Sequence, residues 1–381
     1  MGTIEYTGNH HAFRDKLRRY LDEAVAPHGE AWEQAGIVPL SAWKEMGEKG
    51  YLCTWVPQAY GGRGLDFLYS VIIMEEMAHI GESGFMVSLH SDVVVPYLFT
   101  YGSEEIRNQF LPGCVSGDIV AAVAMTEPDA GSDLASMVST FREEEDCFVL
   151  EGSKTFISNG INCGVVIVAA RDSLEEEPYN AISLFVVEAG TPGFEKGGKL
   201  QKMGLRSQDT AELFFNNCRI PKANLLGQRG SGFIMLMEKL QQERLVCAVS
   251  ALAGAETLVE QTTKKARECI YGSGMPLIKA QEVRFALVEM TAHLKMARAF
   301  VNDLVNQHAA GANVVVETSM AKFLTTDFLN DFSRRSMDLL GEAALDDDDV
   351  FAKALRDGRV MPIFAGTNEI MKEIAARFMG L

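Results

Sequence analysis

The sequence lacks the segments that would direct a protein into or across a membrane. Its longest apolar runs, such as residues 165–170, are far too short to span a bilayer. The first residues, MGTIEYTGNHH, have neither the apolar core of a signal peptide nor the arginines of a transit peptide. The seven cysteines are scattered without a Cys-x-x-Cys pair, which argues against a disulfide framework or a cysteine zinc site. We therefore expect a soluble, cytoplasmic protein with no membrane partner and no metal site.

Positive charge is also scarce in the chain. The 35 lysines and arginines face 52 aspartates and glutamates, which gives a net charge of −17. Such a protein is repelled by nucleic-acid phosphates and by acidic lipids, so no nucleic-acid partner is expected. No Gly-x-Gly-x-x-Gly follows a predicted strand, which disfavours a Rossmann fold. An anionic ligand can still bind locally to a protein of this overall charge.

Three regions with different residue periodicity follow one another along the 381 residues. Residues 11–120 show helical spacing, and helical spacing returns from residue 230 to the end. Between them, short β-branched and aromatic runs such as 165–169 and 182–187 alternate with turn residues. The predicted fold is mainly α with a central β domain. It comprises an N-terminal α-helical domain (1–121), a small antiparallel β-barrel or sandwich (122–229) and a C-terminal α-helical bundle (230–381).

A carboxylate stands in the otherwise apolar helix predicted at 233–256. Helical spacing places Glu243 on one stripe with Leu236 and Cys247. Lys239, four residues earlier, could form an ordinary surface pair with Glu243, and the helix pattern alone favours that interpretation. A buried carboxylate would instead have a raised pKa and could act as a base near neutral pH. The local pattern leaves both interpretations open.

Three short motifs carry polar groups at the ends of predicted elements. MTEPDAGSD (125–133) offers hydroxyls and exposed amides in a loop after a strand, and KTFISNG (154–160) puts Phe156 and Ser158 on one side of a strand. In GTNEI (366–370), Thr367 can cap the last helix. Each motif alone is equally consistent with a plain turn or a capped helix.

In this order, the three motifs resemble those of the acyl-CoA dehydrogenase family, and their sequences are most similar to those of its long-chain members. The likeness extends over essentially the whole chain and includes KMGLRSQDTAELFF (202–215) and IAAR (374–377). It implies a C-terminal four-helix bundle, a tetramer with FAD between subunits, and an electron-transferring flavoprotein as acceptor. The implied reaction turns an acyl-CoA into a trans-2-enoyl-CoA, the α-proton passing to a carboxylate and the β-hydride to the flavin.

The resemblance also implies roles for individual residues. Many members carry the base directly before the Gly-Thr of the last motif, where this chain has Ala365. Long-chain and isovaleryl-type members carry it in a Glu-Arg-Leu context, which implies Glu243 as the catalytic base here. FAD contacts are implied at Met125, Thr126, Ser132, Phe156, Ile157, Ser158, Gln281, Thr367 and Glu369, and substrate contacts at Ser132, Gln241, Arg244, Ala365 and Gly366.

Two elements that relatives donate to a neighbouring subunit depart from the family pattern. The arginine that usually reaches the FAD pyrophosphate falls on Glu268, with Arg267 out of register. The second element, residues 338–345, keeps only Gly341 and runs into four aspartates at 346–349, which could also form a solvated loop. Besides a homotetrameric dehydrogenase, the sequence therefore allows a heterotetramer with a related subunit, an oxidase, or a non-catalytic subunit.

Overall fold

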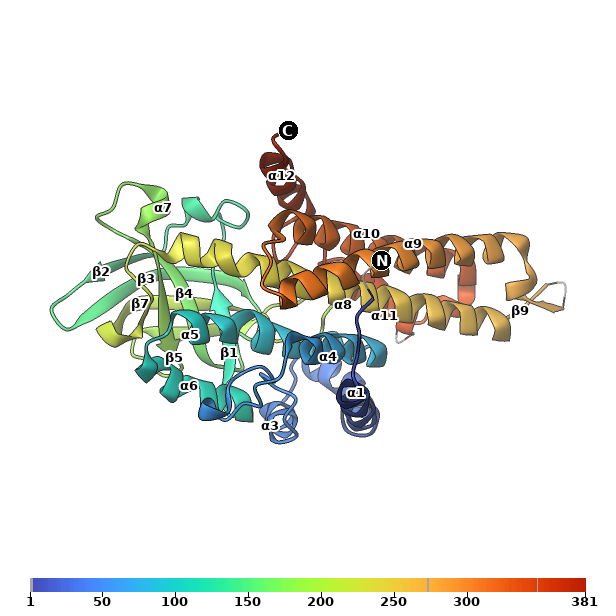
Figure 1. Ribbon diagram of the computed structural model, residues 1–381, viewed down its shortest axis with the longest axis horizontal. Coiled ribbons are helices and arrows are strands. Elements are labelled where there is room, and N and C mark those ends of the chain that lie inside the picture. Colours follow the sequence, from blue (N-terminus) through green and yellow to red (C-terminus); the bar gives the residue numbers. More distant parts are fainter. Residues whose placement is uncertain (1–2, 273, 348) are drawn as a thin grey trace.

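The computed structural model describes residues 3–272, 274–347 and 349–381 (Figure 1). Its first domain is helical, as predicted, and side-chain oxygens of Thr7, Asp66 and Ser103 cap three of its helices. Helix α4 (Phe67–Ile80) is buried over most of its length because its apolar residues pack against two neighbouring helices, α1 and α8. The α-helices are α1 (Gly8–Tyr20), α2 (Gly29–Ala35), α3 (Leu40–Glu48), α4 (Phe67–Ile80), α5 (Val95–Tyr101) and α6 (Glu104–Ser116).

The second domain is one eight-stranded sheet, with strand order β6-β7-β3-β2-β4-β5-β8 and β1 beside β4. Most neighbouring strands are antiparallel, but β1 and β2 both pair in parallel with β4. The sheet is therefore mixed, which alternation along single strands could not predict because it does not identify a strand's partner. The strands are β1 (Val120–Ala124), β2 (Thr140–Glu143), β3 (Cys147–Ile157), β4 (Cys163–Asp172), β5 (Ile182–Glu188), β6 (Phe194–Lys199), β7 (Ala211–Pro221) and β8 (Leu225–Leu226), with the short helix α7 (Pro178–Ala181) before β5.

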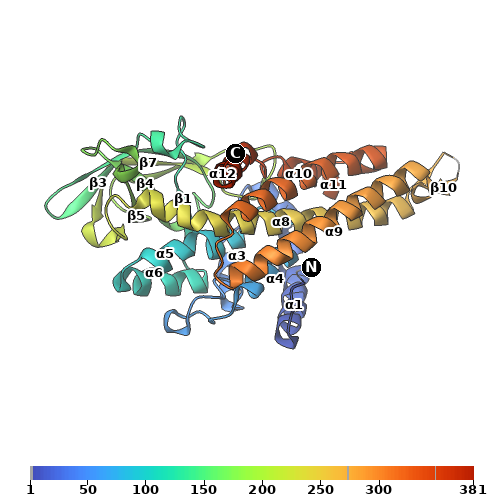
Figure 2. The ribbon, with the colours of Figure 1, turned by 45° about the horizontal axis from the view of Figure 1, so that its top comes forward.

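The third domain is again helical, as predicted. Its long helices α8 (Gly232–Glu268), α9 (Gln281–Ala309) and α10 (Val315–Leu340) lie side by side, and α11 (Val350–Gly358) and α12 (Asn368–Met379) pack against α10. A small hairpin of β9 (Ile270–Tyr271) and β10 (Met275–Pro276) joins α8 to α9 at the end of the bundle farthest from the sheet (Figure 1). Figure 2 shows α8 extending from the sheet into the bundle.

One apolar core is continuous from the N-terminal helices into the C-terminal bundle, with members such as Val71, Leu245 and Leu294. The large buried faces of α4 and α8 meet in it, so these two helices fix the first domain against the third. The described part of the chain contains no helix with the combination of length and apolar character that bilayer crossing would require.

Candidate active site

Glu243 lies on the first half of α8, and its side chain is buried, with 5% of the residue exposed. The Tyr97 hydroxyl donates a hydrogen bond of 2.8 Å to Glu243 Oε1. Burial raises the pKa of Glu243 to about 7, although the Tyr97 hydrogen bond and the charge of Arg244 act in the opposite direction. Lys239 instead donates to Thr100 Oγ1 at 2.7 Å. The surface-pair interpretation is therefore wrong, and the carboxylate faces the protein interior.

Arg244, the next residue, is a buried cation with spare donors. It is 3% exposed, its Nη1 donates to Ser319 Oγ at 3.3 Å, and its Nε has no acceptor among the described residues. Burial lowers the pKa of Arg244, yet a guanidinium remains charged at any physiological pH. A positive charge with an unused N–H group therefore follows Glu243 in the sequence and interacts electrostatically with its carboxylate.

The segment before α12 has an unusual backbone. Ala365 and Gly366 both have positive φ, 52° and 85°, a conformation that only glycine adopts freely. The Ala365 N–H has no acceptor in the part of the chain that the structure describes. Thr367 Oγ1 accepts from the Ile370 N–H at 3.2 Å, which confirms the predicted helix cap. Glu369 lies exposed in the first turn of α12.

Helix α10 connects this segment to the Glu243 region. Ser319 and Lys322 are three residues apart on one face of α10, where Ser319 contacts Arg244 and Lys322 Nζ donates to the Gly366 carbonyl at 2.7 Å. Sequence reasoning missed this face because it searched for carboxylates and loops. The available signal was a row of polar residues at helical spacing along α10, all of them buried: Ser319, Lys322, Thr326, Ser333 and Ser336.

A buried ion pair joins the two predicted flavin motifs of the β domain. Lys154 Nζ lies 2.7 Å from Glu127 Oε1, with both side chains at most 1% exposed. Lys154 also donates to the Met125 carbonyl at 3.1 Å, and the Thr155 N–H donates to the Thr126 carbonyl at 2.9 Å. The strand carrying Phe156 is thereby held beside the loop carrying Thr126.

Phe156 is strained and exposed. Its φ is 56° and 68% of the residue is accessible, where strand β3 loses its regular register with β7. A bulky side chain in the left-handed region is a genuine outlier, and such strain persists mainly at functional sites. Ile157 beside it points into the core of the sheet. Thr126 and Ser158 are half-buried with hydroxyls that make no hydrogen bond in the described ranges, while Ser132 is exposed.

The KMGLRSQDT segment supports the turn that follows strand β3, at residues 158–162. Gln208 Oε1 accepts from the Asn159 N–H at 3.1 Å, and Asp209 Oδ2 accepts from the N–H groups of Ile161 and Asn162 at 3.0 and 2.7 Å. Gln208 and Asp209 are themselves almost fully buried. Gln208 and Asp209 of this motif therefore act on the turn by accepting hydrogen bonds from its backbone N–H groups.

Two predicted residues lie outside this cluster. Gln281 is the exposed first residue of α9, next to the β9–β10 hairpin at the tip of the bundle and far from the sheet of its own chain. Gln241 uses its amide within the chain, where it bonds to His308, to the Ala312 carbonyl and to the Val314 N–H. A substrate contact by Gln241 stays a prediction, and would require these bonds to be exchanged.

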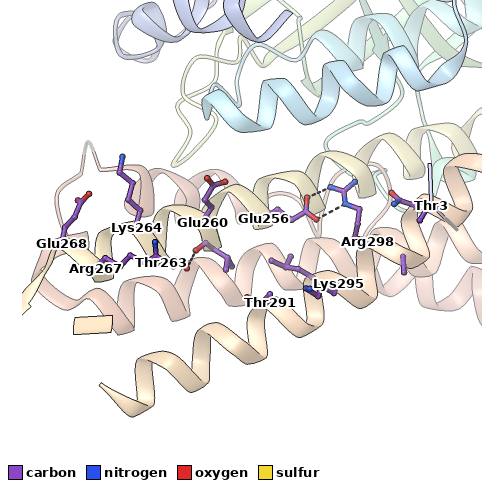
Figure 3. A pocket seen from close by; sticks show the side chains of 14 residues that line it. Thr3, Glu256, Glu260, Thr263, Lys264, Arg267, Glu268, Thr291, Lys295 and Arg298 are labelled. Atoms are coloured by element: carbon purple, nitrogen blue, oxygen red, sulfur yellow. Dashed lines mark hydrogen bonds and ion pairs between the residues drawn. The ribbon is translucent and has the colours of Figure 1, made fainter. Parts of the chain in front are cut away.

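A groove of about 900 Å³ lies between α8 and α9, near the bundle tip (Figure 3). It is not lined by Glu243 or by the β motifs, but by residues of both charge signs, among them Arg267 and Glu268. Arg298 crosses its inner end and donates to Glu256 at 2.9 Å. Arg267 and Glu268, which stand at or next to the position where relatives carry the arginine that reaches a neighbouring subunit, are therefore both exposed on this outer face.

Two aspartates of the acidic run at 346–349 have partners in their own chain. Asp347 accepts hydrogen bonds from Arg206 at 3.1 Å and from Arg356 at 2.6 Å, and these arginines hold the pKa of Asp347 below its usual value. Asp349 caps α11 by accepting from the Phe351 N–H at 3.2 Å. Asp348 lies outside the described residues. Asp347 and Asp349 therefore both have partners within this chain.

Comparison with known proteins finds three family models along the chain: acyl-CoA dehydrogenase N-terminal domain at 7–118, middle domain at 122–218 and C-terminal domain at 230–380. The long-chain specific acyl-CoA dehydrogenase, mitochondrial, of Sus scrofa is 40% identical over 375 residues, which are 98% of this chain and 86% of that protein. An acyl-CoA dehydrogenase of Bacillus subtilis (strain 168) is 33% identical over 367 residues, 96% of each. The solved structure of an acyl-CoA dehydrogenase from Geobacillus kaustophilus has a TM-score of 0.97 and 43% identity, with 100% of both chains covered.

Proposed function

The chain belongs to the acyl-CoA dehydrogenase family, and on that premise we propose that Glu243 is the base of an FAD-dependent α,β-dehydrogenation of an acyl-CoA thioester. The observation that carries the proposal is the burial of Glu243, because burial raises the pKa of its carboxyl to about 7. A carboxylate of ordinary pKa would be a poor base toward a weakly acidic thioester α-proton. Ala365, at the alternative position for the base, cannot accept a proton.

The proton transfer follows from the groups around Glu243. The α-carbon–hydrogen bond breaks, the proton passes to the Glu243 carboxylate, and the electron pair moves toward the thioester oxygen. Donors aimed at that oxygen lower the barrier because negative charge grows on it. The unpaired Ala365 N–H and the spare N–H of Arg244 are the candidates for this role. FAD, when bound, supplies the acceptor for the hydride that leaves the β-carbon, and the product is the trans-2-enoyl-CoA.

The residues of the β domain fit a flavin. Exposed Phe156 offers a planar apolar face, and the hydroxyls of Thr126 and Ser158 are free to bond to the polar edge of a ring system. Ile157 and Met125 would contribute backbone groups beside them, with Ser132 at the more exposed end. Thr367 and Glu369 would meet the same cofactor from the start of α12.

The arrangement of the remaining residues supports an oligomer. Gln281 and Arg267 lie at the tip of the bundle, where they can reach a flavin only in another subunit. We propose a tetramer, either of this chain alone or with a related subunit, that passes electrons to an electron-transferring flavoprotein. The cytoplasm is the proposed compartment, and the free thiols of all seven cysteines are consistent with reducing conditions. The length and branching of the acyl chain are left to experiment.

An anaerobic titration tests the proposed function. Purified, flavin-loaded protein is mixed with straight, branched and cyclic acyl-CoA thioesters, and bleaching of the flavin absorbance is expected with at least one of them. Glu243→Gln should retain the flavin and lose the bleaching by at least about a thousandfold in rate. Peroxide formed at the rate of substrate loss in air would indicate an oxidase. A flavin-loaded wild type that no acyl-CoA bleaches would contradict the proposal and favour a non-catalytic subunit.

A further inference from the structure

Lys322, in the middle of α10, is fully buried with 0% exposure. Its Nζ donates to the Gly366 carbonyl at 2.7 Å and to Asn368 Oδ1 at 2.9 Å. In the described ranges no carboxylate lies within ion-pair distance of this ammonium group. Two neutral oxygens therefore receive the hydrogen bonds of a charge that has been removed from water.

A buried ammonium without an ion pair is unfavourable, because dehydration is not offset by an opposite charge. Burial is the largest influence on the pKa of Lys322 and lowers it. Among the surrounding groups, the Cys247 thiol on α8, Asp327 on α10 and Glu369 on α12 raise this pKa, and the like charge of Arg244 on α8 lowers it. A neutral side chain of similar length would fill the same space at lower cost. The charge therefore calls for an explanation beyond packing.

The segment that Lys322 contacts is the one with the strained backbone. Gly366 has φ 85°, and a Cβ there would lie 2.6 Å from Met371 Cε, so the turn is tightly packed. Asn368 is 3% exposed and donates to Asp327 Oδ1 at 2.8 Å, in addition to accepting from Lys322. Lys322 thus binds both ends of the three residues 366–368, which directly follow the left-handed Ala365.

We propose that Lys322 is a positioning residue for the proposed reaction: it fixes residues 365–368 so that the Ala365 N–H meets the thioester oxygen, and its charge, with that of Arg244, favours the negative charge that forms there. The inference rests on the proposed function. When the α-carbon–hydrogen bond breaks, the proton goes to Glu243 and the electron pair is delocalised onto the thioester oxygen. Cations fixed behind a rigid donor stabilise that oxygen without reorganising during the reaction.

An acyl-CoA analogue with sulfur in place of the β-carbon tests the charge effect. Such an analogue can lose its α-proton but has no β-hydride to give, so the enolate accumulates and produces a long-wavelength absorption with the bound flavin. A pH titration of this band gives the apparent pKa of the bound analogue. In Lys322→Met this pKa should rise by at least about one unit, a tenfold loss of enolate stabilisation, while the dissociation constant of the neutral analogue changes less than about threefold.

Hydrogen exchange of the peptide covering 361–371 tests the positioning effect without any turnover. Exchange should be faster in Lys322→Met than in wild type. Lys372→Met, which removes an exposed cation from the same region, is the matched control and should leave both the exchange and the apparent pKa unchanged. Lys322→Gln keeps a donor for Gly366 but has no charge, so it should retain slow exchange and still show the raised pKa.

Two results would overturn the inference. One is an apparent pKa of the bound analogue in Lys322→Met that equals the wild-type value. If that variant does not fold, the same comparison is made with Lys322→Gln. The other is unchanged exchange of 361–371 in a folded Lys322→Met. Failure of the wild type to bleach with any acyl-CoA would instead refute the proposed function. The two failures can be told apart because the exchange measurement does not depend on catalysis.

Discussion

At the scale of single residues, the site combines burial with a small number of unsatisfied groups. Glu243 is withdrawn from water with one neutral hydrogen-bond donor, Tyr97, and one buried cation, Arg244. The helix pattern drew attention to Glu243 but favoured a surface pair, and it was the family resemblance that implied roles for Glu243 and Arg244. The sequence could not identify Tyr97, because 146 positions separate the two partners and only the packing of α5 on α8 brings them together.

Removing the Tyr97 hydroxyl should shift the pH dependence of the reaction. Its hydrogen bond stabilises the ionised form of Glu243, so in Tyr97→Phe the pKa of the carboxyl rises above about 7. The acidic limb of kcat/KM against pH should therefore move to higher pH by about one unit. Stopped-flow bleaching between pH 5.5 and pH 9 measures this shift. An acidic limb at the wild-type pH would contradict the role of Tyr97 in setting the pKa of Glu243.

The same pKa has a consequence for stability. A carboxyl whose pKa is raised in the folded state from 4.5 to about 7 stabilises the fold below that range, and loses this contribution as pH rises through it. Glu243→Gln carries no such group. It should therefore be more stable than wild type at pH 8, by on the order of 2–3 kcal/mol, and show a smaller advantage at pH 5, as measured by urea unfolding.

At the scale of elements, loops are positioned by buried polar contacts that link distant segments. The Lys154–Glu127 pair joins β3 to the loop after β1, and Glu127 also accepts from the N–H groups of Val138 and Ser139 at 2.6 and 2.9 Å. The sequence predicted the strands and the motifs but gave no reason to pair these two residues. Their contact depends on the parallel placement of β1 and β2 on β4, which local periodicity does not specify.

Breaking this ion pair should destabilise the β domain strongly. Lys154→Met leaves the Glu127 carboxylate buried without a cation, which costs about 3–5 kcal/mol and should also lower the flavin content. Arg334→Met is a matched control, because the Arg334–Asp338 pair is exposed and its loss costs at most about 0.5 kcal/mol. The double variant Glu127→Gln, Lys154→Met should recover part of the loss. Equal effects of Lys154→Met and the control would contradict this role.

At the scale of the whole molecule, the three domains form one body with an exposed outer tip. Glu75 of α4 accepts from Arg298 of α9 at 2.8 Å across the boundary between the first and third domains, and from Arg14 of α1 at 2.6 Å within the first domain. The sequence predicted the order of the domains correctly from changes in periodicity. It also showed the four aspartates at 346–349, but could not predict that Arg206, 141 positions before Asp347, would pair with this residue.

Residues at the bundle tip are predicted to contribute to flavin binding in a neighbouring subunit. Arg267 and Gln281 are exposed, so Arg267→Ala with Gln281→Ala should leave the unfolding of the flavin-free protein unchanged. If copies of this chain complete one another's sites, the double variant should bind flavin about tenfold more weakly. Glu282→Ala, the next exposed residue, serves as the control. A chain that is flavin-poor when purified alone, and unaffected by the double substitution, would point to a different partner subunit.

Helix α8 is one uninterrupted helix from Gly232 to Glu268, and it carries both Glu243 and the tip residue Arg267. The two side chains are held in a fixed rotational phase about 36 Å apart along the axis. One residue inserted between them would turn the tip by about 100° relative to the carboxyl and shift it by about 1.5 Å. A one-residue insertion or deletion between 243 and 267 is thus expected to misplace Arg267 relative to the Glu243 carboxyl.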